Sequence, residues 1–217
     1  MSARADLAAR LRVYLVTDRR NHGGRTVADT VAAAVEGGAT IVQLRDPDAT
    51  GLDLFRLGEE LRDLLAGTGV PLVIDDRLDV ALAVGADGVH LGQTDLPVVQ
   101  ARAVAGADLM IGLSTTNPAQ VHQAISLPKG TVDYLGVGPI WATTTKADAK
   151  PPIGVEGLAA SMAAAGGALP CVAIGGITLD NAHEVAATGA GAAVVSAICG
   201  APDARAATET LARIMAS

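Results

Sequence analysis

The sequence is poor in aromatic residues, which make up only 2% of its 217 residues. Hydrophobic residues nevertheless account for 50% of the chain, so alanine, valine, leucine and isoleucine must fill the core. Small apolar side chains let helices pack closely on strands, which favours a layered α/β architecture over an all-β one. The length suits one α/β barrel or one small open α/β domain.

The sequence also lacks a cluster of basic residues, and its formal net charge is −7. Nucleic-acid-binding domains usually concentrate lysine and arginine on one face, so we expect no nucleic acid partner. An anionic small-molecule substrate would need local positive groups or a metal ion in its site.

Long hydrophobic runs are absent, and the N-terminal segment MSARADLAARLR lacks the apolar stretch of a secretory signal. We therefore expect no membrane span and a cytoplasmic location. The two cysteines, Cys171 and Cys199, both lie in apolar surroundings. In a cytoplasmic protein they are expected to be buried free thiols rather than a disulfide.

Short apolar runs alternate with helical patterns along the whole chain, as in parallel βαβ units. The strands are expected at residues 13–17, 41–45, 72–74, 89–91, 110–113, 134–137, 171–174 and 192–195. A helical pattern follows each of them, and the junctions GGATIVQLR, GADGVHLG and GAGAAVVSA repeat a Gly-Ala helix end that runs into a strand. Eight such units predict a single-domain (β/α)8 TIM barrel over residues 1–217. An open sheet of six or seven strands is the alternative if one of the short apolar runs does not form a strand.

Two aspartates follow neighbouring expected strands. Asp76 comes just after the strand at 72–74, and Asp95 comes shortly after the strand at 89–91. Neighbouring parallel strands lie about 4.8 Å apart, so the two carboxylates can meet above one edge of the sheet. Two carboxylates without a nearby cysteine suit a hard cation that keeps some of its waters, which favours Mg²⁺. The alternative is that each aspartate caps a helix.

Other strand ends carry groups that can hold an anion. Gly175-Gly176 and Ser196 follow the last two expected strands, where barrels often bind phosphate through backbone amides, although the glycine pair could simply form a tight turn. Gln43 and Arg45 alternate with apolar residues and therefore share one face of their strand. His90 lies on a strand, where a histidine is usually a hydrogen-bonded core residue and not a catalyst.

The longest connection of the chain, residues 138–154, contains Thr143, Thr145 and Lys146. It is too polar and too long to be only a connector, which indicates a ligand-binding loop, with a solvated lid as the alternative. No Ser-His-Asp or Cys-His arrangement, Walker motif or GxGxxG fingerprint is present. The polar groups at the strand ends therefore favour phosphate binding over nucleophilic catalysis.

Six motifs occur in order along the chain: YLVTD, GADGVHLGQTDLP, IGLST, GPIWATTTKADA, AIGGIT and AVVSAI. With them, nearly the whole sequence resembles the thiamine-phosphate synthase family, also called thiamine-phosphate pyrophosphorylase. The resemblance implies a (β/α)8 transferase that joins hydroxymethylpyrimidine diphosphate to thiazole phosphate and releases pyrophosphate. Ionisation of the pyrimidine methylene before attack, a dissociative route, is implied as well.

The resemblance also implies site residues. Asp76 and Asp95 would hold Mg²⁺ on the diphosphate, and Arg45, Ser114 and Lys146 would hold the leaving pyrophosphate as the catalytic residues.

Further residues would bind the two heterocyclic substrates. Gln43 would contact the pyrimidine, whereas Thr143 and Thr145 would bind the thiazole phosphate. The backbone amides expected to help hold that phosphate are those of Gly176, Val195 and Ser196.

Two positions depart from the family pattern. Pro47 stands where the family has lysine, and Asp75, in the expected substrate-binding set, stands where the family usually has asparagine. A charged hydrogen bond to phosphate contributes roughly 1.5–3 kcal/mol, so its loss could weaken diphosphate binding about tenfold to a hundredfold. Arg19, Arg20 and Arg77 are candidate compensating cations, and Asp75 is a candidate member of the metal shell. We expect a P47K variant to be more active.

Two rival functions remain open from the sequence. A thiazole tautomerase of the same fold would need neither pyrimidine nor metal, and a non-catalytic phosphate-binding barrel would show no turnover. Retention of Asp76, Asp95 and Lys146 favours the synthase, because a tautomerase has no pyrophosphate to hold. The expected partners are small-molecule substrates, and a homo-oligomer is compatible with the sequence.

Overall fold

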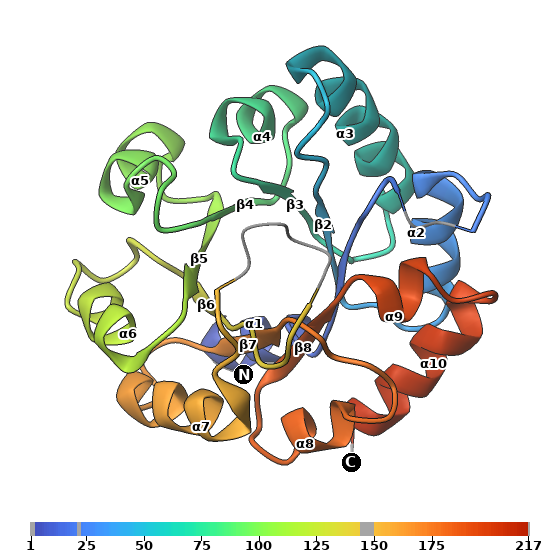
Figure 1. Cartoon of the computed structure of the whole chain (residues 1–217). Coiled ribbons are helices and arrows are strands. Elements are labelled where there is room, and N and C mark those ends of the chain that lie inside the picture. Colours follow the sequence, from blue (N-terminus) through green and yellow to red (C-terminus); the bar gives the residue numbers. More distant parts are fainter. Residues whose placement is uncertain (1–2, 21–22, 144–149, 217) are drawn as a thin grey trace.

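The computed structural model describes residues 3–20, 23–143 and 150–216. Its strands pair in sequence order, and the last pairs with the first, so they form a closed parallel barrel ringed by helices (Figure 1). The strands are β1 Val13–Val16, β2 Ile41–Leu44, β3 Leu72–Asp75, β4 Gly88–Leu91, β5 Met110–Thr115, β6 Tyr134–Val137, β7 Cys171–Ile174 and β8 Gly191–Val194. The predicted barrel is therefore confirmed, and the open sheet of six or seven strands is wrong.

One helix follows each of the first seven strands, and two follow the last. They are α2 Val27–Glu36, α3 Gly51–Leu65, α4 Leu78–Val84, α5 Val98–Ala105, α6 Pro118–Ile125, α7 Gly154–Ala165, α8 Ala182–Ala186, α9 Ser196–Cys199 and α10 Ala204–Met215. The helix α1 Ala3–Arg10 and the short α9 were not predicted. Leu7 of α1 packs on the apolar residues inside the barrel, so α1 covers the end at which the strands begin (Figure 1).

Alternation along the strands sorts their side chains into two layers. In β1, Tyr14 and Val16 belong to a small cluster inside the barrel, whereas Val13 and Leu15 belong to the large cluster between strands and helices. A two-residue period is the expected consequence of strand geometry. On each strand, the residues in register with Tyr14, and those two positions away from them, therefore point toward the barrel axis.

Local sequence signals mark the starts of two helices. The Thr26 hydroxyl accepts the Asp29 amide while the Asp29 carboxylate accepts the Thr26 amide, a capping box that begins α2. Asn117 caps α6, with Pro118 as its first residue. In the part of the chain that the structure describes, no helix is long and apolar enough to cross a membrane. Cys171 and Cys199 are free and buried, as predicted.

Candidate active site

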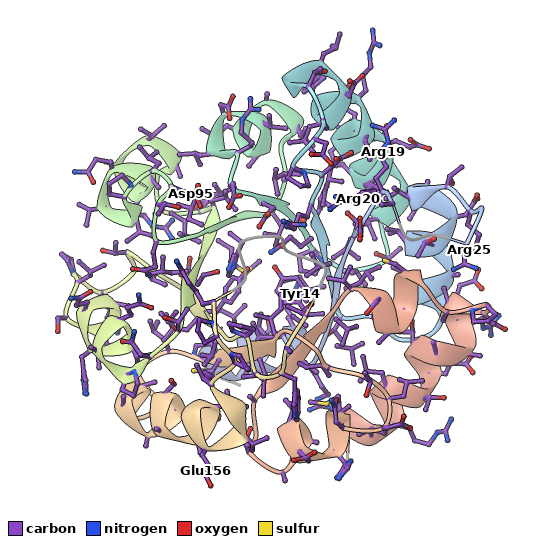
Figure 2. All side chains as sticks on the ribbon, in the orientation of Figure 1. Tyr14, Arg19, Arg20, Arg25, Asp95 and Glu156 are labelled. Carbon is purple, nitrogen blue, oxygen red and sulfur yellow. The ribbon has the colours of Figure 1, made fainter. Side chains whose placement is uncertain are left out.

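A chain of hydrogen bonds crosses the barrel interior. Gln43 Nε2 donates to Tyr14 Oη at 2.9 Å, and Tyr14 Oη lies 2.9 Å from Tyr134 Oη. His90 continues the chain, with Nδ1 3.0 Å from Tyr134 Oη and Nε2 2.9 Å from Ser114 Oγ. Figure 2 shows Tyr14 in the middle of the ring of strands. The chain therefore connects two predicted substrate-binding residues, Gln43 and Ser114, through side chains from three other strands.

Two glycines make room for this chain. A Cβ atom at Gly112 would collide with the Tyr134 ring and with His90 Nδ1, and one at Gly136 would come within 2.9 Å of His90 Cε1. Both glycines take interior positions on β5 and β6, where Gly112 pairs with His90 on one side and Tyr134 on the other. The two large rings thus occupy space that any side chain at Gly112 would fill.

Burial keeps both phenols of the chain protonated. Desolvation is the largest effect and raises the pKa of Tyr14 and of Tyr134 well above the usual tyrosine value, and the negative charge of Asp75 raises both further. Each phenol therefore has one proton to donate at neutral pH. His90 is a buried, hydrogen-bonded core histidine, as predicted.

Arg45 and Asp75 form an ion pair at the end of the barrel where the strands finish. Arg45 Nε lies 3.2 Å from Asp75 Oδ2, and the two side chains are 15% and 16% exposed. Thr17 holds the Arg45 backbone, since its hydroxyl accepts the Arg45 amide at 3.0 Å. The position that departs from the family pattern is thus occupied by a carboxylate that neutralises a predicted catalytic arginine.

Asp76 and Asp95 leave the neighbouring strands β3 and β4. The Asp76 amide donates to His90 O at 2.8 Å, which ties the end of β3 to β4. Asp76 has φ 58°, the only positive φ of a non-glycine residue in the described ranges. Aspartate tolerates this conformation, and such outliers cluster at functional sites. Asp95 Oδ2 accepts the Gly92 amide at 2.7 Å, which fixes its carboxylate in the turn after β4 (Figure 2).

Helix capping does not account for either aspartate. Arg77 precedes α4 and Pro97 precedes α5, and neither helix has a side-chain capping bond. The capping alternative is therefore wrong for both Asp76 and Asp95. Within residues 3–20, 23–143 and 150–216, no group of three or more histidine, cysteine or acidic side chains could hold a metal ion. Two carboxylates on adjacent strand ends fit a cation such as Mg²⁺, which fills its remaining positions with water and substrate phosphate.

Backbone contacts join the loops that follow β6 and β7, at the rim of the barrel where the strands end. Trp141 N donates to Gly175 O at 3.0 Å, and Gly175 and Gly176 have φ 101° and 66°. A Cβ atom at Gly176 would meet Ala142 O and Trp141, so the glycine pair lets the loops after β6 and β7 approach closely. Both readings of the glycine pair, a tight turn and a phosphate cradle, are compatible with this packing.

The remaining predicted residues lie near this rim or outside the described part of the chain. Val195 and Ser196 follow β8 at the start of α9, and Thr143 ends the described part of the loop after β6. Thr145 and Lys146 lie outside the described residues.

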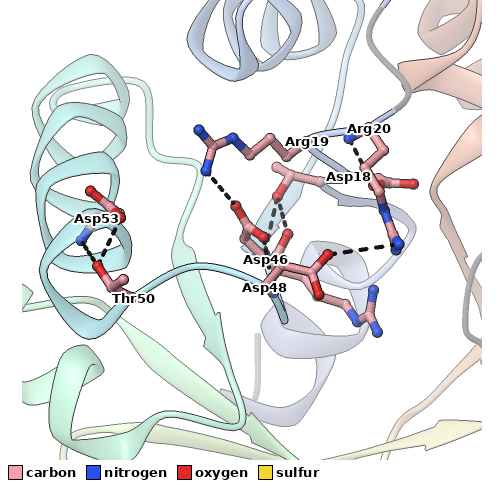
Figure 3. Close-up of polar contacts among 9 residues, drawn as sticks. Asp18, Arg19, Arg20, Asp46, Asp48, Thr50 and Asp53 are labelled. Atoms are coloured by element: carbon pink, nitrogen blue, oxygen red, sulfur yellow. Dashed lines mark hydrogen bonds and ion pairs between the residues drawn. The ribbon is translucent and has the colours of Figure 1, made fainter.

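Pro47 is exposed in the turn after β2, and its neighbours bind the proposed compensating arginines. Arg19 Nη1 lies 3.5 Å from Asp46, and Arg20 Nη1 lies 3.7 Å from Asp48 (Figure 3). Arg77 is paired as well, with Asp79 at 2.6 Å. Each of the three arginines is therefore already neutralised by a carboxylate, so none is a spare cation.

A cavity of about 510 Å³ lies outside the barrel, beside α2 and α3. Its polar lining consists mainly of charged side chains, including Arg25, Arg56 and Glu60. Arg19 and Asp46, which follow β1 and β2, also line it, but none of the residues predicted to bind substrate or metal does.

Comparisons with known proteins agree with this geometry. Residues 13–198 match the family described as thiamine monophosphate synthase. The chain belongs to the thiamine monophosphate synthase family. A thiamine-phosphate synthase of Albidiferax ferrireducens is 54% identical over 89% of this chain and 86% of the relative. Another, of Azorhizobium caulinodans, is 50% identical over 94% of this chain and 95% of the relative.

A solved structure extends the match to three dimensions. Thiamine phosphate pyrophosphorylase from Pyrococcus furiosus superimposes with a TM-score of 0.86, at 40% identity, over 97% of this chain and 98% of that one. The predicted family and the predicted enzyme activity, thiamine-phosphate synthase, are confirmed by these matches. Membership of the thiamine monophosphate synthase family thus rests on sequence and on fold alike.

Sequence patterns did not single out Tyr14 or Tyr134 as parts of the site. They are the only two tyrosines in the chain. Each stands on an expected strand, two positions from another residue that faces the interior. The two-residue period of a strand could therefore have placed both tyrosines inside the barrel. Their mutual contact depends on strands far apart in sequence, which no local pattern reveals.

Proposed function

We propose that this chain joins hydroxymethylpyrimidine diphosphate to thiazole phosphate, giving thiamine phosphate and pyrophosphate. The C–O bond to the diphosphate would break first and leave a pyrimidine methylene cation, and the thiazole nitrogen would then form the C–N bond to that carbon. The electron pair of the broken bond leaves with pyrophosphate. The nitrogen carries no proton, so the reaction needs no general base.

The strand ends of β2 to β5 support this reaction. Gln43 would contact the pyrimidine, while Arg45 and Ser114 would hold the departing pyrophosphate, together with Lys146 of the loop outside the described residues. Cationic and hydroxyl groups fixed where negative charge accumulates lower the barrier of a dissociative step. His90, whose imidazole contacts Ser114, has partners at both ring nitrogens, in line with a reaction that needs no base.

Asp76 and Asp95 would hold Mg²⁺, and Asp75 would adjust the charge of Arg45 beside them. A divalent cation would supply charge neutralisation for the diphosphate. The exposed position of Asp76 and the fixed Asp95 carboxylate are compatible with an ion that keeps some waters. The thiazole phosphate would bind at the opposite rim, through Thr143, Thr145 and the backbone amides of Gly176, Val195 and Ser196.

The observation that carries the proposal is the hydrogen-bonded connection between Gln43 and Ser114 beside the Arg45–Asp75 pair. We also propose a cytoplasmic enzyme made of one domain over residues 1–217, acting on small molecules. Mass spectrometry of a reaction with both heterocycles tests the activity, because only a synthase forms thiamine phosphate. Isomerised thiazole phosphate without pyrimidine consumption would instead identify a tautomerase, and binding without any conversion would identify a phosphate-binding barrel.

A further inference from the structure

The interior hydrogen-bond chain has a direction. Gln43 occupies one acceptor position of Tyr14 Oη by donating to it, so the single Tyr14 proton has Tyr134 Oη as its acceptor. Tyr134 Oη then accepts from Tyr14 and donates its own proton to His90 Nδ1. A phenol that donated elsewhere would leave a buried hydroxyl without an acceptor, which is unfavourable.

The direction continues through the imidazole. If His90 Nδ1 accepts a proton from Tyr134, a neutral ring carries its own proton on Nε2. Nε2 must then donate to Ser114 Oγ, 2.9 Å away. The hydroxyl proton of Ser114 is thereby turned away from His90, and Ser114 is half-buried at the end of the barrel where the strands finish.

We propose that Tyr14, Tyr134 and His90 are positioning residues, which fix His90 as the Nε2–H tautomer and make the Ser114 hydroxyl a donor toward a bound anion. The proposal rests on the proposed function only in naming that anion as the substrate diphosphate. Reversal of the chain would require Ser114 to donate to His90 and the Gln43 side-chain oxygen to face Tyr14. In that state the Ser114 oxygen would present lone pairs to the anion, which disfavours binding.

The packing shows that this arrangement is specific. Tyr14 and Tyr134 are 1% and 0% exposed, and their ring centroids lie 6.2 Å apart. The His90 and Tyr134 centroids lie 5.4 Å apart, in the space left by Gly112. Burial holds the pKa of both phenols high, so neither phenolate can interrupt the chain near neutral pH. The hydrogen-bond chain also links the groups proposed for the two ends of one substrate, since Gln43 would bind the pyrimidine ring and Ser114 would bind the diphosphate.

The tautomer can be measured without turnover. The ¹⁵N chemical shifts of imidazole nitrogens distinguish protonated from unprotonated atoms, and comparison with an H90Q variant assigns the ring among the four histidines of the chain. In the full-length wild-type protein with inorganic pyrophosphate and Mg²⁺, we expect His90 to be protonated at Nε2 and unprotonated at Nδ1. Protonation at Nδ1, or at both nitrogens, would overturn the proposal whether or not the protein proves to be a synthase.

Kinetics give a second test. A Y134F variant should raise the KM for the diphosphate about tenfold while leaving the KM for thiazole phosphate unchanged, because only the donor at Ser114 is affected. A Y14F variant leaves the Tyr134–His90–Ser114 contacts in place but removes the donor to Tyr134 and the partner of Gln43, so it should raise the KM for the diphosphate less than Y134F does. Equal changes in the two KM values of Y134F, or a larger rise of the diphosphate KM in Y14F, would count against the proposed role of the interior hydrogen-bond chain.

Discussion

Arg45 Nε and Asp75 Oδ2 lie 3.2 Å apart, so the arginine that we propose as a diphosphate ligand is already paired with a carboxylate. In the proposed reaction the diphosphate would compete with Asp75 for the Arg45 guanidinium and would approach the negative charge of Asp75. The same charge acts on the barrel interior, where it raises the pKa of Tyr14 and Tyr134 beyond the effect of burial. Asp75 thus acts mainly on Arg45 and, as a smaller effect than burial, on the two interior tyrosines.

Removal of this charge should favour the substrate. A D75N variant keeps the size of the side chain, and we expect it to lower the KM for the diphosphate about fivefold, or roughly 1 kcal/mol. The control is D79N, which removes the partner of Arg77 on the exposed surface and should leave the KM unchanged. A higher KM for D75N would show that Asp75 instead holds Arg45 in its productive position.

Addition of a positive charge at the same rim should act in the same direction. We expect P47K to raise kcat/KM by up to about tenfold, because a charged hydrogen bond to phosphate is worth roughly 1.5 kcal/mol or more. A P47A variant separates the new charge from the loss of the proline ring. The explanation fails if P47K has no effect, or if P47A is equally active.

The metal site should depend on the charge of Asp95 and not on its place in the turn. Asparagine can still accept the Gly92 amide, so D95N should leave the melting temperature within about 2 °C of wild type. The Mg²⁺ concentration for half-maximal activity should rise at least about tenfold, since an anionic ligand is lost. The control is D108N, on an exposed aspartate at the other end of the barrel. An unchanged Mg²⁺ requirement for D95N would remove Asp95 from the proposed metal site.

Sequence patterns predicted the barrel correctly because each βα unit carries its own signals of apolar run, helix cap and glycine stop. They also placed Gln43, Arg45, Asp76, Asp95 and Ser114 at or near strand ends, since polar residues there stand out against apolar strands, and the binding roles of these residues stay predictions. The pairing of Arg45 with Asp75 depends on the register between β2 and β3, which sequence spacing does not determine. The interior tyrosine pair likewise depends on barrel closure, which brings β1 and β6 to face each other.

The interior chain should be sensitive to the smallest added side chain. A G112A variant places a methyl group against Tyr134 and His90, and overpacking of this kind typically costs 1–3 kcal/mol, so we expect a loss of about 2 kcal/mol in the free energy of unfolding. At Gly51 a Cβ atom would meet only the flexible end of Arg77, so G51A should be neutral or slightly stabilising. Urea unfolding followed by circular dichroism measures both. Wild-type stability of G112A would contradict the packing described here.

The two buried thiols should make stability depend on pH under alkaline conditions. Burial raises the pKa of Cys171 and of Cys199 to about 11. Because these values lie above those of the unfolded chain, the stabilisation is complete below the ordinary thiol pKa and is lost as the pH rises toward 11. We expect the free energy of unfolding to fall between about pH 9 and pH 11, and to fall less in a C171A/C199A double variant. An identical pH dependence in the two proteins would show that the thiols do not contribute.

The most direct test of the proposed chemistry is the release of pyrophosphate by the purified protein. The assay supplies each heterocyclic phosphate alone and both together, with Mg²⁺, with EDTA, and with Mg²⁺ restored after EDTA. We expect one pyrophosphate per thiamine phosphate formed, only when both substrates and the metal are present, with full recovery when Mg²⁺ is restored. Absence of release at high enzyme concentration, or release that is unaffected by EDTA, would contradict the proposed metal-assisted condensation.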